Sequence, residues 1–498
     1  MRWLVDFVVD FNWFVLTYFV ALNATYLVVI AGAAATMVRS VRRPDPASRD
    51  DIFANPLTPA VSILVPAFNE SAGIIDSVRG MLTLRYPQFE VVVVDDGSTD
   101  DTFELLRREY DLREVAPTID TAVPLRGEIR SVHVPSAGDE PLVVVRKANA
   151  GRRADALNAG LNVARYPLVC MVDADSLLDP DALLRVVQPF LTDPQRVVAT
   201  GGAIRPVNGA KVYRGQVVEV GQPRRWIERI QVVEYQRAFL LGRTGWSRFS
   251  GLLIISGAFG LFRRDAILEV GGLDANSLGE DADLVATLHR HLREHRREYA
   301  VVFVPEPACW TELPRDRRVL GRQRRRWSHG LAQVLWKQRR MMFNPRYGRV
   351  GLVVLPYYLF FELLGPIVEL LGIAAVAVGL AFGLVNVSFA LLLATVALAY
   401  GVLLSFAALA IDQLTPHHST EWRDIGIGAL AAVAENLGYR QLHAWWRLRG
   451  LWSSVRGRDP AWGEMPRTGF TAPPAANPAS SQGMRPVRAG RHDQLLRR

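Results

Sequence analysis

Cysteine is scarce in this chain, and several catalytic loop motifs are missing. The 498 residues include two cysteines, Cys170 and Cys309. Neither lies in a CxxC pair, which argues against a zinc site or a disulfide framework and suits a cytoplasmic catalytic domain. A GxSxG nucleophile elbow and a GxxxxGK[ST] phosphate loop are both absent from the sequence. Acyl-transfer and P-loop chemistry therefore have no support.

Nucleic-acid-binding motifs are missing too, although the chain is basic. Its formal net charge is +9, but it has neither zinc-finger spacing nor an RNP-type aromatic motif. Positive charge of this kind is typical of cytoplasmic loops that lie next to anionic lipid. We therefore expect a lipid bilayer, and no nucleic acid, among the partners of the protein.

Long apolar runs lie near both ends of the chain. Residues 11–38 are long enough for a transmembrane helix, which needs about 20 residues, and the arginines that follow should hold that end in the cytoplasm. Residues 351–450 are a second apolar region, in which we expect two or three spans: 352–383, 386–411 and, interrupted by polar residues, 424–446. This pattern predicts a multi-pass protein of the plasma (inner) membrane with a cytoplasmic catalytic domain.

The end of the chain is less well defined by its sequence. Arginines after residue 446 favour a cytoplasmic location for the tail, whereas counting spans from an outside N-terminus places it outside. Segment 424–446 is therefore interfacial or re-entrant, or the charge rule fails here. Residues 471–498 are rich in Pro, Ala, Ser and Arg, which predicts a disordered tail.

Residues 60–330 have an α/β pattern and follow a linker over 39–59. Four apolar runs, VSILVPAFN, FEVVVVDD, LVVVRK and PLVCMVD, predict strands. They lack polar alternation, which is typical of strands buried on both faces of a mostly parallel sheet. Ligands bind beyond the carboxyl ends of such strands, and the side chains that fall there are Asn69, Asp95, Asp96, Lys147, Asp173 and Asp175.

Two acidic motifs directly follow predicted strands. Asp173 and Asp175, in a DAD triplet, offer the oxygen ligands that a hard divalent cation prefers, with diphosphate oxygens as further ligands. Asp95 and Asp96 can accept hydrogen bonds from a base or a ribose. Both motifs also have a plainer interpretation, since an Asp at a strand end often caps the next helix.

Cations and a further acidic pair accompany these motifs. Lys147, Arg152 and Arg153 come near the same edge, where they would meet phosphate or form a solvated basic loop. Glu280 and Asp281 follow a glycine in a stretch with no clear helix or strand pattern. An acid at this position can act as a general base towards an acceptor hydroxyl, or it can cap a helix.

The run QRRRW, with Gln323, Arg326 and Trp327 in the spacing QxxRW, stands just before the second apolar region. The stretch after it, 331–350, is basic and amphipathic and predicts a helix at the membrane surface. A basic run beside a membrane segment is usually only flanking charge. Here it also suits an enzyme that holds an anionic leaving group and delivers a product towards the bilayer.

As an ordered set, these motifs resemble those of family 2 glycosyltransferases, and more narrowly the membrane-embedded processive synthases of cellulose, chitin oligosaccharide, hyaluronan and poly-N-acetylglucosamine. The matching segments are VPAFNE (65–70), DDGS (95–98), KANAGRRADALN (147–158), DAD (173–175), SGAFGLFRR (256–264), GED (279–281), CWTELP (309–314) and QRRRW (323–327). Two departures stand out. The usual TED is GED here, and the usual lysine of the KxxxGKAxALN segment is Arg153, which keeps the charge but contacts phosphate differently.

The resemblance implies a Rossmann-like GT-A fold and an inverting transfer from a UDP-sugar. It implies a Mg²⁺ or Mn²⁺ ion on Asp173 and Asp175, and a base at Asp281 with Glu280 beside it. Contacts to the leaving group and the acceptor are implied for Gln323, Arg326 and Trp327. Implied donor contacts are Pro66, Asn69, Glu70, Asp95, Asp96, Lys147, Arg153 and Asp173. Implied acceptor contacts are Ser256, Gly257, Phe259, Trp310 and Trp327.

These features favour a membrane enzyme that polymerises a sugar into a β-linked polysaccharide and exports it, with accessory export proteins as candidate partners. The alternative is the addition of a single sugar to a lipid, since the same motifs can serve it and product length separates the two. A transporter or a non-catalytic nucleotide-sugar sensor is the third interpretation. A transporter usually has more spans and repeated halves, and a dead sensor should have lost a carboxylate, whereas all are present.

Overall fold

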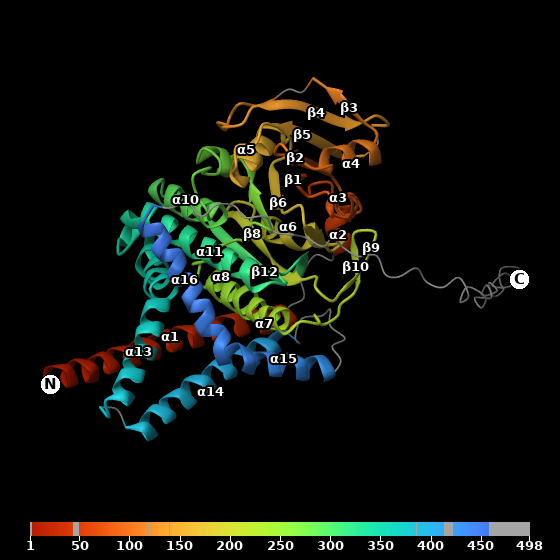
Figure 1. The fold of residues 1–498 in the computed structure, drawn as a ribbon. Coiled ribbons are helices and arrows are strands. Elements are labelled where there is room, and N and C mark those ends of the chain that lie inside the picture. Colours follow the sequence, from red (N-terminus) through yellow and green to blue (C-terminus); the bar gives the residue numbers. More distant parts are fainter. Residues whose placement is uncertain are drawn as a thin grey trace, which may run out of the picture.

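A ten-stranded sheet lies in the middle of the molecule, and a group of long helices lies beyond one end of it (Figure 1). The computed structural model describes residues 2–42, 49–116, 119–138, 140–384, 386–412 and 422–457, so the predicted disordered tail over 471–498 lies outside the described residues. In their order across the sheet, the strands are β3 (Leu112–Val115), β4 (Ile129–Pro135), β5 (Leu142–Lys147), β2 (Phe89–Asp95), β1 (Val61–Ala67), β6 (Leu168–Val172), β11 (Phe259–Arg263), β8 (Val197–Pro206), β12 (Ala300–Thr311) and β7 (Ser176–Leu178).

The sheet is mixed, which corrects the expectation of a mostly parallel one. The four predicted strands β5, β2, β1 and β6 form a parallel block, and β8 pairs with β12 in parallel. The pairs β3–β4, β4–β5, β6–β11, β8–β11 and β7–β12 are antiparallel. These added strands are short or irregular, and β12 shifts register at Pro307, so they lack the continuous Val-rich runs by which the parallel block was recognised.

Both faces of the sheet are covered by helices. In β1, Ile63 and Val65 pack into the core on one face and Leu64 into the core on the other, as the alternation of side chains along a strand requires. The covering helices are α3 (Ile74–Leu82), α4 (Thr102–Glu109) and α6 (Ala182–Thr192) on the first face, and α5 (Arg153–Val163), α9 (Arg264–Glu269) and α10 (Glu280–Glu294) on the second. The strands β9 (Lys211–Tyr213) and β10 (Gln216–Glu219) form a separate two-stranded antiparallel sheet.

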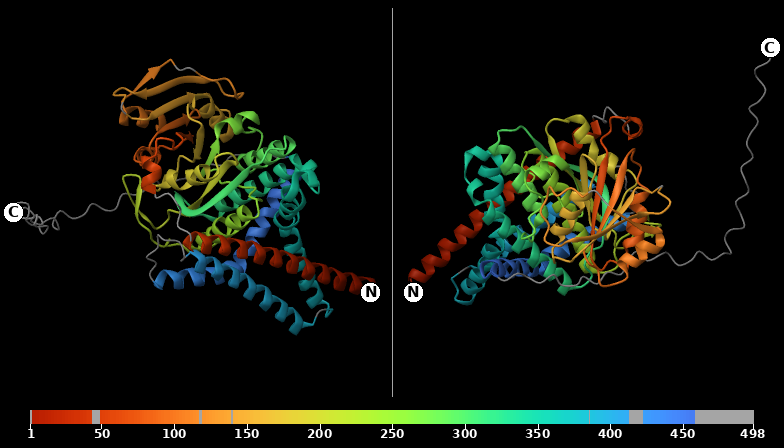
Figure 2. Two further views of the ribbon diagram at one scale, coloured as in Figure 1. Left: turned by 180° about the vertical axis from the view of Figure 1, so that it is seen from behind. Right: turned by 90° about the horizontal axis from the view of Figure 1, so that it is seen from above.

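The long helices run past one end of this domain (Figure 2). These helices, with the shorter helices and turns between them, are α1 (Arg2–Arg42), α7 (Trp226–Tyr235), η1 (Gln236–Gly242), α8 (Arg243–Arg248), α11 (Arg317–Lys337), η2 (Arg339–Met341), η3 (Pro345–Tyr347), η4 (Val350–Val354), α12 (Leu355–Tyr357), η5 (Tyr358–Leu363), α13 (Gly365–Ala381), α14 (Val387–Asp412), α15 (Trp422–Ala434), η6 (Glu435–Tyr439) and α16 (Arg440–Val455). The short helix α2 (Arg49–Ala54) instead packs on the sheet domain through Ile52. Helix α1 approaches α8 closely at Val29 and α13 at Val15.

The apolar helices only partly match the predicted spans. Within the described residues, one helix, Asp10–Arg39, is long and apolar enough to cross a membrane. A bent pair, Val350–Leu363 and Gly365–Ala381, meets the same criterion when its two parts are taken together, with a bend of 41°. In place of a single interfacial helix over 331–350, α11 continues to Lys337 and short 3₁₀ turns follow it.

Candidate active site

The loops after β1 and β2 are tied together by hydrogen bonds. The Asn69 side-chain oxygen accepts from the Thr99 backbone N–H at 2.8 Å, and the Asn69 backbone N–H donates to the Ser98 hydroxyl at 3.1 Å. The Glu70 backbone N–H donates to the Thr102 hydroxyl at 2.9 Å. Asn69 has a positive φ of 56°, a conformation that Asn tolerates better than most residues. The predicted donor loop therefore has a fixed shape where it lines the cavity.

The DDGS motif separates into a structural and a cavity-facing carboxylate. Asp95 is buried and accepts from the Ser98 backbone N–H at 3.0 Å, whereas Asp96 lines the cavity. The fully buried Lys147 ammonium is hydrogen bonded to Asp96 and lies 2.9 Å from Asp155. Burial raises the pKa of Asp96, and Lys147 opposes that rise. Lys147 thus orients Asp96, and neither Lys147 nor Asp95 lines the cavity in which phosphate would lie.

Arg153 joins the predicted metal carboxylate to the acidic pair on α10. Its guanidinium lies 2.7 Å from the Asp173 carboxylate and 2.9 Å from that of Glu280, and it donates to the Gly257 carbonyl at 2.7 Å. Although burial alone would lower the pKa of Arg153, Asp173 and Glu280 raise it above its ordinary value. Burial raises the pKa of Glu280, and Arg153 opposes that rise. The arginine therefore organises the acidic centre of the site.

The donor set at the end of β6 fits a hard divalent cation. Asp173 and Asp175 both line the cavity, and a third of the Asp173 side chain is exposed to it. Over the described ranges, the chain has no group of three or more His, Cys, Asp or Glu side chains placed to hold a metal. Two carboxylates leave coordination positions for diphosphate oxygens and water, as Mg²⁺ sites in nucleotide enzymes usually do.

Asp281 is the second residue of a helix. Helix α10 begins at Glu280 with Gly279 as its N-cap, where sequence indicated no clear helix before residue 283. The start was missed because a glycine N-cap provides no capping side chain. The Asp281 carboxylate accepts from the Gly257 backbone N–H at 3.1 Å and lines the cavity. The Asp281 carboxylate therefore lies at the positive end of the α10 dipole.

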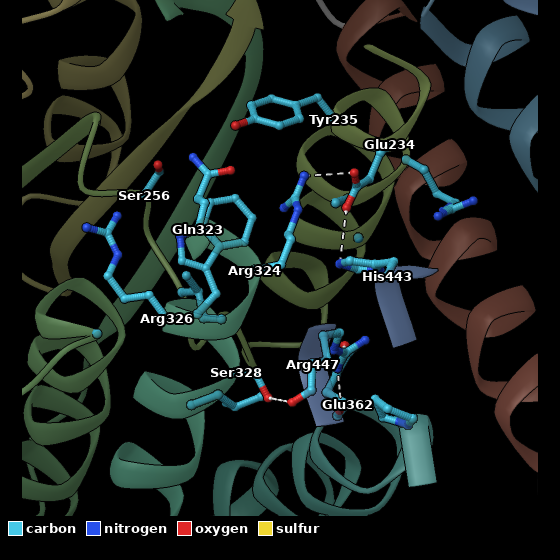
Figure 3. A pocket seen from close by; sticks show the side chains of 18 of the residues that line it. Glu234, Tyr235, Ser256, Gln323, Arg324, Arg326, Ser328, Glu362, His443 and Arg447 are labelled. Carbon is cyan, nitrogen blue, oxygen red and sulfur yellow. Dashed lines mark hydrogen bonds and ion pairs between the residues drawn. The ribbon is translucent and has the colours of Figure 1, made fainter. Parts of the chain in front are cut away.

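Helix α11 presents the QxxRW side chains to the same cavity (Figure 3). Burial lowers the pKa of Arg326, and Glu280 and Asp173 oppose that effect. Trp327 is 40 % exposed, so its ring has a free surface. The Gln323 side-chain oxygen is buried and has no hydrogen-bond partner in the described part of the chain, which leaves an acceptor for a ligand hydroxyl.

A single cavity of about 2050 Å³ brings most of the predicted site residues together. Those that line it are Pro66, Asn69, Glu70, Asp96, Arg153, Asp173, Asp175, Ser256, Gly257, Glu280, Asp281, Gln323, Arg326 and Trp327. Two predicted acceptor residues do not. Phe259 is completely buried in the core, and Trp310 faces a separate cavity of about 540 Å³.

Several lining residues were not predicted. Glu234 on α7 accepts hydrogen bonds from Arg324 at 2.8 Å and from the Tyr439 hydroxyl at 3.0 Å. Arg324 stands inside the QRRRW run and was visible in the sequence, but its partner was not. Glu234 belongs to no recognisable motif, since only the tertiary fold brings its side chain to Arg324 of α11 and Tyr439 of η6.

The helices that carry Asp281 and the QxxRW motif are fastened to each other. The Lys337 ammonium lies 2.7 Å from both the Asp274 and the Asp283 carboxylates. The two backbones also approach closely, since a Cβ atom on Gly330 would lie 2.9 Å from the backbone nitrogen of Gly279. The Gln338 side chain at the end of α11 also donates to the Thr287 hydroxyl on α10 at 3.1 Å. The spacing between Asp281 on α10 and the QxxRW motif on α11 is therefore held by backbone contact, by Lys337 and by this hydrogen bond.

We expect Lys337→Met to lower kcat about 10-fold to 10²-fold while changing the donor KM little, because a displacement of about 1 Å at a catalytic group has this effect. Lys337→Arg should recover part of the activity. The matched control is Lys211→Met, which removes an exposed ion pair with Glu219 on the β9–β10 hairpin. Steady-state kinetics would check this, and an unchanged kcat with only a lower Tm would reduce Lys337 to a role in stability.

This arrangement of strand-end carboxylates and facing helices is that of a glycosyltransferase with a GT-A-like fold. The profile of the family described as "Glycosyltransferase like family 2" matches residues 59–330. The chain belongs to that family, and the resemblance found in its motifs is confirmed.

Individual relatives agree with the family assignment. Poly-beta-1,6-N-acetyl-D-glucosamine synthase of Staphylococcus epidermidis (strain ATCC 35984) is 27 % identical over 275 residues, which are 55 % of this chain and 55 % of that protein. The enzyme of the same name from Staphylococcus aureus (strain COL) is 28 % identical over 277 residues, with the same coverage. The chain therefore spans about half the length of the curated relatives it matches.

A solved structure shares the fold. A mannosyltransferase from Pyrobaculum calidifontis, in complex with GDP-Man and Mn²⁺, superimposes with a TM-score of 0.50 at 22 % sequence identity. The match covers 86 % of this chain and 99 % of the other. At this identity the likeness concerns the fold alone.

Proposed function

We propose that the protein polymerises a sugar from a UDP-sugar donor into a β-linked polysaccharide and exports the chain across the membrane. The observation that supports this is the continuity of one cavity, which is lined both by the catalytic motifs and by polar residues of η5, α13, η6 and α16. A hydrophilic glycan crosses hydrocarbon only where polar groups satisfy its hydroxyls. Addition of a single sugar to a lipid does not need such a path.

In this proposal the donor binds along the carboxyl edge of the sheet. The loop with Asn69 and the Asp96 carboxylate would contact the nucleoside. Asp173 and Asp175 would hold Mg²⁺ or Mn²⁺, which when bound offsets the charge that gathers on the diphosphate. Arg326 would bind a phosphate of the leaving group through two N–H donors in a fork.

The acceptor would lie between α10 and α11. Asp281 would take the proton of the acceptor hydroxyl as that oxygen attacks the anomeric carbon, and the UDP leaves from the opposite side, so that the configuration inverts. Gln323 would accept a hydrogen bond from a sugar hydroxyl, and the exposed Trp327 face would stack on a sugar ring. Ser256 and Gly257 line the same cavity as these residues.

We also propose that the protein is a multi-pass protein of the plasma (inner) membrane with its catalytic domain in the cytoplasm. Helix α1 and the bent pair η4–α13 are the segments that fit a membrane by length and composition. Accessory export proteins are further candidate partners.

The test is synthesis in sealed proteoliposomes with outward-facing catalytic domains. UDP-N-acetylglucosamine is the first donor to try, because the curated relatives are named for poly-N-acetylglucosamine. We expect polymer that resists added glycanase until detergent is present. Products of only one or two sugars, all extracted with lipid, would instead support single transfer.

Substitutions in the QxxRW motif should separate its two contacts. Lys reproduces the two-pronged phosphate contact of Arg poorly, so we expect Arg326→Lys to lower kcat about 10-fold or more. Trp327→Ala should raise the acceptor KM more than the Kd for UDP, since the ring would serve the sugar. Kinetics with a soluble oligosaccharide acceptor and UDP titration would measure both. A change in UDP affinity alone in the tryptophan variant would contradict the acceptor role.

A further inference from the structure

Between the catalytic motifs and the helices of the second apolar region, the cavity wall carries buried and partly buried ion pairs. Glu234 is paired with Arg324 at 2.8 Å, and Figure 3 shows both side chains on the cavity together with His443. Glu435 is held by two nitrogens of Arg237, at 2.5 and 3.1 Å. The Glu435 side chain is only 6 % exposed.

Two more pairs continue the wall. Arg447 on α16 lies 3.1 Å from the Glu362 carboxylate on η5, and the same guanidinium also donates to the Glu362 backbone carbonyl. Arg440 lies 3.3 Å from Glu369 on α13. All four side chains line the cavity.

The charges of this part of the wall cancel pair by pair. Within the described residues, helices α1, α13, α14 and α16 with turns η5 and η6 contribute these Asp, Glu, Lys and Arg side chains to the cavity: Glu362, Glu369, Glu435, Arg440 and Arg447. Each of these has an opposite charge within 3.3 Å. The adjoining η1 and α8 add Arg237, which pairs with Glu435, and Arg243, which interacts with the Asp281 carboxylate in the catalytic part of the cavity. Tyrosine side chains of α1, α12, η5 and η6 lie between them, and they offer flat rings and hydroxyls. The wall is therefore rich in hydrogen-bonding groups while its paired charges sum to zero.

We propose that the exported polymer is electrically neutral, built from uncharged hexose or N-acetylhexosamine units, and that uronic acids and free amino sugars are poorly extended. This inference rests on the proposed export function. Pores that select anions carry unbalanced Arg or Lys side chains, and pores that select cations carry unbalanced Asp or Glu. Here a charged sugar gains a partner only by breaking an existing ion pair, which leaves the other member without its counter-charge.

A neutral sugar passes the same wall without that cost. Its hydroxyls donate to the free lone pairs of a paired carboxylate and accept from the remaining N–H groups of a paired guanidinium. The ion pairs stay intact while the glycan advances. The wall thus favours a chain that carries many hydroxyls and no net charge.

The first experiment compares donors with the full-length protein in proteoliposomes. The donors are UDP-glucose, UDP-N-acetylglucosamine, UDP-glucuronic acid and UDP-glucosamine, and mass spectrometry gives the product length. A short soluble acceptor reports single transfer separately from extension.

We expect long chains from a neutral donor, and from the charged donors chains at least about 10-fold shorter. Chains of equal length from UDP-glucuronic acid or UDP-glucosamine would overturn the inference. Single transfer without extension from every donor would overturn the proposed function instead.

The second experiment tests the balance of charge within one pair. Glu369→Gln and Arg440→Gln each leave one uncompensated charge, so each should shorten the product. The double variant restores neutrality and should give longer chains than either single variant. The matched control is the exposed pair Lys211–Glu219, for which both singles and the double should match the parent. If the double variant gives chains no longer than those of the single variant with the shorter product, the pair contributes something other than charge balance. The inference then fails. A Tm for each variant identifies any that do not fold, in which case the donor comparison decides.

Discussion

Replacing Asp281 by Asn should lower turnover by about 10² or more, which is the usual scale for loss of a general base. The Asn side chain is of nearly the same size and can still accept from the Gly257 backbone N–H, so the start of α10 should keep its shape. Binding of the UDP-sugar should survive, because Asp281 is assigned to the acceptor side. Single-turnover kinetics and donor titration would measure the two effects separately.

A matched control for this variant is Asp265→Asn. Asp265 also stands in the first turn of a helix, α9, but it does not line the cavity. We expect near-parental turnover from the control. Near-parental turnover in Asp281→Asn itself would remove the residue from the role of base.

Removal of the divalent cation should abolish activity, and added Mg²⁺ or Mn²⁺ should restore it. The diphosphate gathers negative charge as the glycosidic bond of the donor breaks. Two carboxylates without a cation would repel this charge, whereas a bound cation offsets it. Asp173→Asn should likewise lower kcat by about 10² or more, the scale of several kcal/mol that a bound cation supplies. Turnover after chelation, and after titration with each metal, is the measurement.

Another DxD triplet in the sequence, Asp179-Pro180-Asp181, provides the control. Asp179 pairs with the buried Arg185 at 2.9 Å and does not line the cavity, so Asp179→Asn should leave the metal requirement unchanged. Full activity after exhaustive chelation would contradict the assignment of Asp173 and Asp175 as metal ligands.

The parts of the fold that could be predicted are those with a local signature. The strands of the parallel block were recognised from their apolar runs, and the carboxyl ends of β1, β2 and β6 do bring Asn69, Asp96 and Asp173 around one cavity. Antiparallel strands such as β11 went unrecognised, because pairing partners distant in sequence determine them.

The roles of single side chains were harder to predict than their location. Lys147 stands at a strand end like a phosphate ligand, yet it is buried between Asp96 and Asp155. Trp310 belongs to a matching motif, but its strand turns the ring towards another cavity. Such facts depend on the direction of a side chain, which neither composition nor spacing determines.

The contact between Gly279 and Gly330 has a consequence for redesign. Because the two helices meet there through main-chain atoms, the backbone sets their separation at this point. A library that varies the residues around Gln323 and Trp327 would alter which acceptor is accommodated while the reacting groups keep their distance. Alanine at Gly330 should do the reverse, because its Cβ atom would lie 2.9 Å from the Gly279 backbone nitrogen: the pocket lining would stay the same, but α10 and α11 would move apart.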